Sequence, residues 1–261
     1  MENDLITADQ RTDGILAAPR IVRVGSVLLV VVLWELIGRA QPLFMSYPSQ
    51  MARTAWDLLV VDDRLLPALG ESLWGLAAGF GIAAVLGVIL GFAIAGSRVL
   101  DVALSPYVAA LYATPRITLI PLLVLWVGID FKLRLSIVVL SAVFPIIIIV
   151  RDGAKQVGSD FVDVARSYGA SRLKMFSTVI LPGSLPYVFV ALRLGIQRSL
   201  IGVIVAEMTS AVSGTGRLLL QFGRVFQTDR LLVPIIIIGF FSILLTWLLH
   251  RAEVRVSPWT R

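Results

Sequence analysis

The sequence predicts an all-α polytopic membrane protein with about six transmembrane helices. Hydrophobic residues make up 57% of the 261 residues and charged residues only 15%, whereas soluble domains average about 45–50% and about 25%. The mean hydropathy is +0.89, and long apolar stretches recur along the whole chain. This composition excludes an ordinary soluble domain, and it excludes a disordered chain still more firmly.

Six apolar stretches are candidates for crossing the hydrocarbon core of a bilayer. The first predicted transmembrane helix occupies residues 21–40 and carries Arg23 and Glu35. The other five stretches cover residues 72–96, 102–129, 135–150, 187–208 and 231–249. Together they define a transmembrane core at residues 66–250, flanked by polar tails at residues 1–20 and 251–261.

The segment at residues 41–70, which follows the first predicted helix, is polar enough to lie outside the membrane. Its apolar side chains fall on one helical face and are Met51, Ala55, Leu58 and Leu59. A one-sided apolar stripe of this kind predicts an amphipathic helix on the external membrane surface.

The second and third predicted transmembrane helices carry different signals. In the second, a small residue recurs at every fourth position, at Gly75, Gly79, Ala83, Gly87, Gly91 and Ala95. These residues predict a smooth ridge that lets a neighbouring helix approach closely. The third is broken by Pro106, Pro115, Arg116 and Pro121. Prolines and a central arginine predict a kinked or interrupted helix that lines a polar cavity.

The distribution of Lys and Arg predicts the orientation. These residues are more frequent in the tails and in the connection at residues 151–186 than in the loops on the other side, and positive residues are retained on the cytoplasmic side. Both termini and residues 151–186 are therefore predicted to be cytoplasmic in a bacterial inner membrane protein. The net charge of +6 reflects these loops, and no basic run with interleaved aromatics predicts nucleic-acid binding.

The composition also limits the chemistry of the chain. It has no cysteine and one histidine, His250, which excludes disulfides and thiolate zinc or iron–sulfur sites and leaves little room for histidine-based sites. No G-x-S-x-G or H-E-x-x-H motif occurs, and none of the three lysines follows a glycine, so there is no Walker A motif. We therefore expect no catalytic residue, metal site or cofactor in this chain.

The connection at residues 151–186 is long enough to need a structure or a purpose of its own. Phe161, Val164, Ala165 and Tyr168 recur at helical spacing, and Gly169 follows where a left-handed residue ends a helix. Ser171 begins a second predicted helix, which ends at Leu181 before Pro182. The exposed apolar stripe either docks into a groove of a partner protein or packs back on its own bundle.

The same segment resembles the EAA loop of ABC-importer permeases, whose pattern is E-A-A-x3-G-x9-I-x-L-P. Here Asp163-Val164-Ala165 stands for the first three positions, Gly169 for the glycine, and Val179-x-Leu181-Pro182 for the last four. Further motifs resemble the nitrate/sulfonate/taurine-type branch over roughly residues 45–259 and include Thr114-Pro115-Arg116, Ala165 to Ser171, Ala206-Glu207-Met208 and Gly214-Thr215-Gly216.

The resemblance implies a type I ABC importer permease fold and an ATP-driven importer. It implies a permease dimer, taken as a homodimer, with two cytoplasmic ATPase subunits that bind ATP and Mg, and a periplasmic or lipid-anchored binding protein. The implied cargo is a small, anionic solute similar to a sulfonate, nitrate or taurine. The implied ATPase-coupling residues are Asp163, Val164, Ala165, Tyr168, Gly169, Ala170, Leu181 and Pro182.

Four ionisable residues lie deep in the predicted transmembrane helices, namely Arg116, Arg193, Arg198 and Glu207. Each would cost several kcal/mol if it faced lipid, so the bundle interior or a cavity is expected instead. For Arg116, Arg198 and Glu207 the alternatives are a substrate pathway and an internal ion pair. The ion pair is favoured for Glu207, and the substrate pathway for Arg116 and Arg198. Arg193 is expected to reach the membrane interface.

A secondary transporter or channel is the alternative function. It would fit the composition, the broken third helix and the internal charges. It does not explain a docking helix in the connection at residues 151–186, and the sequence shows no inverted repeat. An intramembrane enzyme has no motif in its favour.

Overall fold

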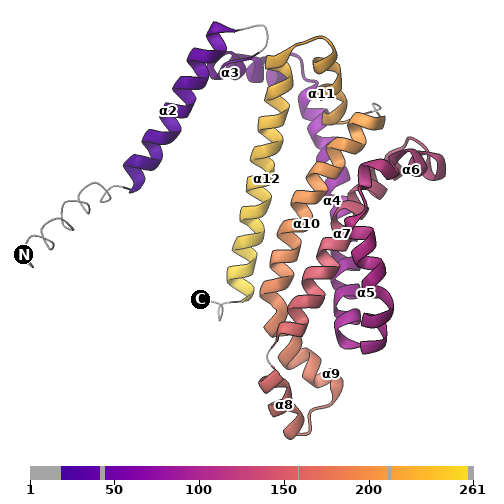
Figure 1. Cartoon of the computed structure of the whole chain (residues 1–261). Coiled ribbons are helices and arrows are strands. Elements are labelled where there is room, and N and C mark those ends of the chain that lie inside the picture. Colours follow the sequence, from indigo (N-terminus) through magenta and orange to yellow (C-terminus); the bar gives the residue numbers. More distant parts are fainter. Residues whose placement is uncertain (1–18, 42–44, 158, 211–212, 258–261) are drawn as a thin grey trace, which may run out of the picture.

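The computed structural model describes residues 19–41, 45–157, 159–210 and 213–257, and these residues form helices joined by short connections (Figure 1). No strand occurs in these ranges, so the predicted all-α class is confirmed. Most of the predicted N-terminal tail, and residues 258–261 of the C-terminal tail, lie outside the described residues.

Four helices in these ranges are long and apolar enough to cross a membrane, and they match the second, fourth, fifth and sixth predicted spans. They are α4 (Leu65–Gly96), α7 (Phe131–Gln156), α10 (Leu181–Ser210), which continues an earlier helical segment, and α12 (Thr228–Val256). A bent pair of helices is the candidate for a fifth crossing.

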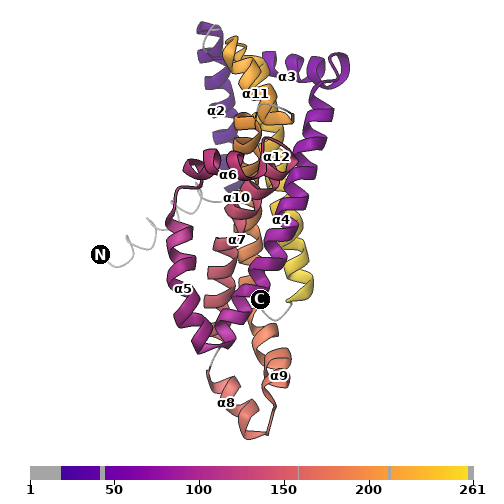
Figure 2. The ribbon, with the colours of Figure 1, turned by 90° about the vertical axis from the view of Figure 1, so that its right-hand side faces the viewer.

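The predicted interruption of the third span is confirmed. Helix α5 (Arg98–Ala113) is followed by the 3₁₀ turn η2 (Arg116–Leu119) and by α6 (Ile120–Val127), and the two segments are bent by 91°. Pro115 lies at the break in an extended conformation, because proline lacks the N–H that would continue the helix. Figure 2 shows α5 alongside the bundle and α6 turned away from the direction of α5 at the upper end of that helix.

Helix α2 (Pro19–Ala40) stands where the first span is predicted and runs for 22 residues. It carries Arg23, Glu35 and Arg39 and is not among the helices that meet the length and composition criteria for a span in the described part of the chain. The total of six spans therefore depends on α2. Its path diverges from the other helices (Figure 1), and the side chains along it are mostly exposed.

The amphipathic segment predicted at residues 41–70 contains α3 (Pro48–Trp56) and the π-helical turn η1 (Asp57–Val61). Met51 and Leu58 of this segment are buried against Leu65 and Phe222 in one cluster. The segment is shorter than predicted, because α4 begins at Leu65 and not at Ser72. Pro67 does not prevent this early start, because the first turn of a helix needs no N–H donor there.

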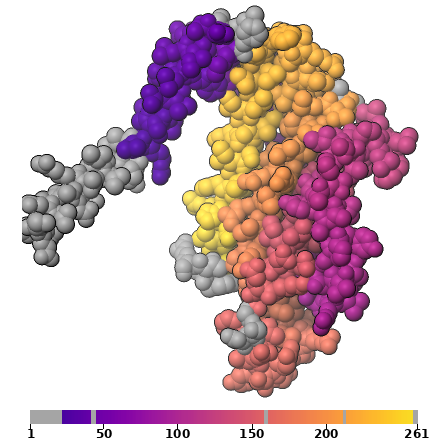
Figure 3. All heavy atoms as spheres, in the orientation of Figure 1, coloured from indigo at the N-terminus to yellow at the C-terminus, as the bar shows by residue number. Residues whose placement is uncertain are grey.

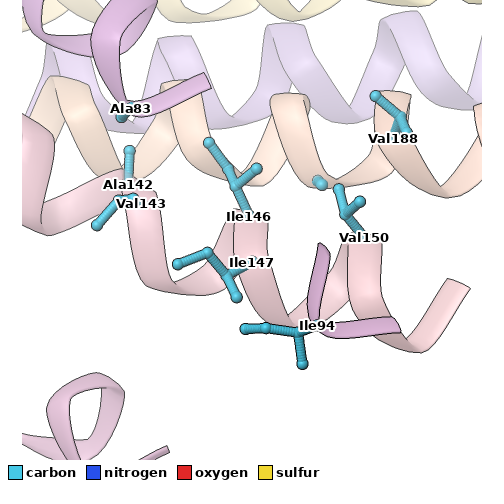
Figure 4. Close-up of a cluster of buried hydrophobic side chains, with 9 residues drawn as sticks. Ala83, Ile94, Ala142, Val143, Ile146, Ile147, Val150 and Val188 are labelled. Atoms are coloured by element: carbon cyan, nitrogen blue, oxygen red, sulfur yellow. The ribbon is translucent and has the colours of Figure 1, made fainter. Parts of the chain in front are cut away.

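The small residues of α4 form the predicted ridge, and α7 packs along it. Gly79, Gly87 and Gly91 are buried on the face of α4 that meets Val138, Ile146 and Val150 of α7. Figure 4 shows the cluster at this contact, to which α4, α7 and α10 contribute Ala83, Ile94, Ala142, Val143, Ile146, Ile147, Val150, Ala191 and Val188. The missing side chains let the two backbones approach closely, so that dispersion contacts hold the helices together.

We expect Gly87→Leu to destabilise this packing, whereas Gly81→Leu on the same helix should not. A Cβ atom at Gly87 would lie 2.6 Å from Cγ2 of Ile146, but a Cβ atom at Gly81 meets no atom within 4 Å. Overpacking of this kind costs about 1–3 kcal/mol or more. The thermal unfolding midpoint of the purified variants measures the difference, and equal midpoints would show that the α4–α7 contact is not tight at Gly87.

Candidate functional sites: a projecting helical loop and an arginine-lined cavity

The connection at residues 151–186 forms a compact helical loop that projects from one end of the bundle. It contains α8 (Ser159–Ser167), α9 (Arg172–Met175) and the π-helical turn η3 (Phe176–Ile180). Figure 3 shows this loop extending beyond the ends of the other helices. The described end of α12 lies at the same end of the bundle (Figure 1).

The predicted glycine turn between the two helices of the loop is present. Gly169 has a φ of 71°, its N–H donates to the carbonyl of Arg166 at 2.9 Å, and the N–H of Ala170 donates to the carbonyl of Ala165 at 3.0 Å. This pattern ends a helix with a left-handed residue that favours glycine. The Oγ of Ser171 then accepts from the N–H of Lys174 at 3.4 Å and caps α9.

The second loop helix does not end at Pro182 as predicted. Helix α9 continues through η3 into α10, so that helical structure is unbroken from Arg172 to Ser210. Proline at the second position of α10 is tolerated, because η3 widens the preceding turn and removes the need for a regular i to i−4 bond there. Leu181 and Pro182 thus join the loop rigidly to a membrane-spanning helix.

The loop presents large apolar side chains to its surroundings. Phe161, Val164, Tyr168 and Leu173 expose between 57% and 88% of their surface. Asp163 is also exposed and forms an ion pair of 3.4 Å with Arg166. A groove of about 590 Å3 separates α8 from the start of α10, and Val157, Ala165, Val179, Pro182 and Tyr187 are among its lining residues. The stripe is therefore not buried on its own bundle.

Arg116 and Arg198 lie together at a second site. Both line a cavity of about 180 Å3, together with Ile117, Ile120, Ile137, Ser141, Ile201, Gly202 and Val205. Nη2 of Arg116 donates to the carbonyl of Tyr112 at 3.3 Å, and its guanidinium stacks 5.4 Å from the centre of the Tyr112 ring. Nε of Arg116 is buried without a hydrogen-bond partner. Among the described residues, no carboxylate forms an ion pair with either arginine.

Glu207 does not line this cavity. It is fully buried, and its Oε2 accepts hydrogen bonds from Oγ of Ser72 at 2.8 Å and from the N–H of Gly216 at 2.9 Å. Its Oε1 lies 3.5 Å from Nε of Arg134. The favoured internal ion pair is thus present, and its partner is Arg134 and not Arg116 or Arg198.

Arg134 is the residue that the sequence analysis missed. It lies in the first turn of α7, where Nη1 donates to the carbonyl of Glu71 at 3.1 Å and Nη2 donates to Oγ of Ser213 at 2.5 Å. The aliphatic part of its side chain fills the space above Gly75. Arg134 therefore ties α4, α7 and α10 together next to α11 (Thr215–Arg224), whose first turn holds the Glu207 carboxylate. A helix N-terminus favours a negative charge at this place.

Arg193 also has a partner, which the sequence did not predict. Its Nη2 lies 3.1 Å from Oε2 of Glu253 on α12, and the same carboxylate oxygen lies 3.3 Å from Nδ1 of His250.

Comparison with known proteins shows which family and which relatives the chain resembles. Residues 83–261 match the family described as binding-protein-dependent transport system inner membrane component. The putative aliphatic sulfonates transport permease protein SsuC of Escherichia coli (strain K12) is 34% identical over 92% of each chain. The taurine transport system permease protein TauC of the same strain is 27% identical over 90% of this chain and 88% of the relative.

Two more relatives extend the comparison. The nitrate import permease protein NrtB of Leptolyngbya laminosa is 28% identical over 81% of this chain and 78% of the relative. Among solved structures, an inward-facing conformation of the MetNI methionine ABC transporter matches with a TM-score of 0.59. That match has 18% identity and covers 73% of this chain and 95% of the other, so it supports the fold.

Proposed function

The chain belongs to the family of binding-protein-dependent transport system inner membrane components, and we propose that the solute it moves is a small anion. It is a multi-pass inner membrane protein and the permease subunit of an ABC importer. A secondary transporter or channel that works without an ATPase is not favoured by this membership.

The arginine-lined cavity carries the proposal of an anionic solute. Two guanidinium groups share a cavity of about 180 Å3 in which no described carboxylate pairs with them. Arginine stays charged and presents a planar fork of donors that suits sulfonate, carboxylate or nitrate oxygens. The relatives whose names specify sulfonates, taurine and nitrate are consistent with this chemistry. Selection among anions is assigned to the external binding protein that delivers the solute.

The test is uptake by a reconstituted permease–ATPase complex carrying Arg116→Gln or Arg198→Gln. Taurine, ethanesulfonate and nitrate serve as probes, each with its binding protein. A charge-assisted hydrogen bond contributes about 1.5–3 kcal/mol, so we expect each variant to lose about tenfold or more in uptake at low solute concentration. Arg64→Gln, at an exposed arginine of the external segment, is the control. Normal uptake in both cavity variants, or a binding protein that selects a cation, would refute the anion assignment.

The loop at residues 151–186 is proposed as the docking site of the ATPase subunits. Its support is the exposed apolar stripe on the short helix α8, since such a stripe fits a groove on a partner. The Gly169 turn connects α8 to α9, which is continuous with α10. The proposed residues are Asp163, Val164, Ala165, Tyr168, Gly169, Ala170, Leu181 and Pro182. In the full complex we propose two copies of this chain, two ATPase subunits that bind ATP and Mg, and one external binding protein.

Docking of a cytoplasmic ATPase requires residues 151–186 to be cytoplasmic, and we propose that both termini lie on the same side. The chain has no cysteine, so Asp163→Cys gives a single reactive thiol on an exposed side chain. We expect a membrane-impermeant thiol reagent to label this variant in inside-out vesicles and not in intact cells. Labelling in intact cells would reverse the proposed orientation, and Val61→Cys at the opposite end of the bundle should show the opposite pattern.

A further inference from the structure

A second cavity on the membrane-spanning part of the chain is not explained by the site described above. It is a groove of about 440 Å3 between α10 and α12, which contact each other along the bundle (Figure 1). Arg193 and Gln197 line it from α10, and Ser242, Thr246 and His250 line it from α12. The spacings of four residues place each set on one face of its helix.

The groove lies on a neighbouring face of α10, nearer to the projecting loop than the Arg116–Arg198 cavity. Gln197 of the groove and Ile201 of the cavity are one helical turn apart, and both are exposed. Arg193 lies five residues before Arg198, which is about 7.5 Å along the helix axis. Because α10 starts at the projecting loop, Arg193 is nearer to that loop than Arg198 is. Polar residues therefore continue from the cavity toward the end of the bundle that carries the loop.

The polar side chains that line the α10–α12 groove would cost free energy if they faced lipid. A polar occupant of the groove is therefore favoured. Arg193 and His250 supply hydrogen-bond donors, and both contact the carboxylate of Glu253. An anion entering the groove would compete with Glu253 for Arg193. The groove should therefore hold an anion less tightly than the cavity, where the arginines lack a carboxylate partner in the described chain.

We propose that the α10–α12 groove is a second anion site, through which the solute leaves the Arg116–Arg198 cavity toward the cytoplasm. The inference rests on the proposed function. A site that is weaker near the exit suits conduction, because binding must favour entry and still permit release. Glu253 is in this account a counter-charge that limits the affinity of Arg193 for the passing anion.

The experiment measures the electrostatic potential in the groove without transport. Thr246→Cys provides one thiol in a cysteine-free chain, and the permease–ATPase complex is studied in nanodiscs. The probes are the sulfonate reagent 2-sulfonatoethyl methanethiosulfonate and its trimethylammonium counterpart. The rate of each reagent at position 246 is divided by its rate with a small free thiol. The quotient for the sulfonate reagent over that for the trimethylammonium reagent is the anion-to-cation ratio. We expect a ratio above one that falls several-fold with Arg193→Gln and rises several-fold with Glu253→Gln.

The control is Phe226→Cys, an exposed position in the turn before α12, where neither Arg193→Gln nor Glu253→Gln should change the ratio. Opposite changes at Thr246→Cys support the proposal. A thiol at position 246 that reacts with neither charged reagent indicates a groove covered by lipid or by another chain, and it overturns the proposal. A ratio that ignores both substitutions overturns it as well. The uptake test of Arg116 and Arg198 does not depend on these reaction rates. Failure of the proposed anionic solute can therefore be distinguished from failure of the proposed groove site.

Discussion

Leu173→Asp should abolish most ATP-driven uptake while leaving the permease folded in the membrane. Leu173 exposes 78% of its surface on the projecting loop, so no internal packing is lost when it is replaced. An apolar anchor at the centre of an interface contributes about 2 kcal/mol or more, which corresponds to roughly 30-fold weaker docking. A buried, unpaired carboxylate at the same place adds a desolvation cost.

The measurement compares solute uptake and stimulated ATP hydrolysis in proteoliposomes that contain equal amounts of permease. Val61→Asp is the matched control, because Val61 exposes 72% of its surface and lies on η1 at the opposite end of the bundle. If Leu173→Asp supports wild-type uptake, or if Val61→Asp impairs it equally, the loop does not transmit the motion of the ATPase.

Arg134→Met should be the most destabilising single substitution of an arginine in this chain. Among the described residues, it leaves the buried Glu207 carboxylate with hydrogen bonds from Ser72 and Gly216 alone. Removing one member of a buried ion pair costs about 3–5 kcal/mol. We expect a large fall in the thermal unfolding midpoint of the purified protein, and impaired packing of α11 on the bundle.

Two further variants make this expectation specific to the ion pair. The double variant Arg134→Met/Glu207→Leu should recover part of the lost stability, because it removes both charges from the interior. Arg116→Met should cost less, because no described carboxylate depends on Arg116. A double variant whose loss of stability equals or exceeds the sum of the two single losses would contradict the coupling between Arg134 and Glu207.

Features that depend on local sequence could be predicted, and the structure contains them. The ridge of α4 is encoded by small residues at every fourth position, of which Gly79, Gly87 and Gly91 contact α7. The interruption near Pro115 and the left-handed turn at Gly169 follow from the backbone chemistry of proline and glycine. Each of these predictions needed only neighbours within a few turns of one helix.

Features that depend on pairing between distant segments could not be predicted. Arg134 marks one end of a predicted span, and nothing near it in sequence indicates that Glu207 is its partner. The shared cavity of Arg116 and Arg198 likewise arises only when η2 folds onto α7 and α10. Pro182 was misleading, because the π-helical turn η3 before it removes the regular backbone bond that a proline interrupts.

Cross-linking at Tyr168 tests most directly whether the projecting loop docks the ATPase. Tyr168 is the most exposed of the large apolar residues on the loop, at 88%. Tyr168→Cys, in the cysteine-free chain, is treated with a short thiol-reactive photo-crosslinker in membranes that contain the assembled complex. We predict one major cross-linked product that contains the ATPase subunit, and none from Val61→Cys. A cross-link from position 168 to the permease's own α10 would contradict the docking assignment. So would a cross-linked product that does not contain the ATPase subunit.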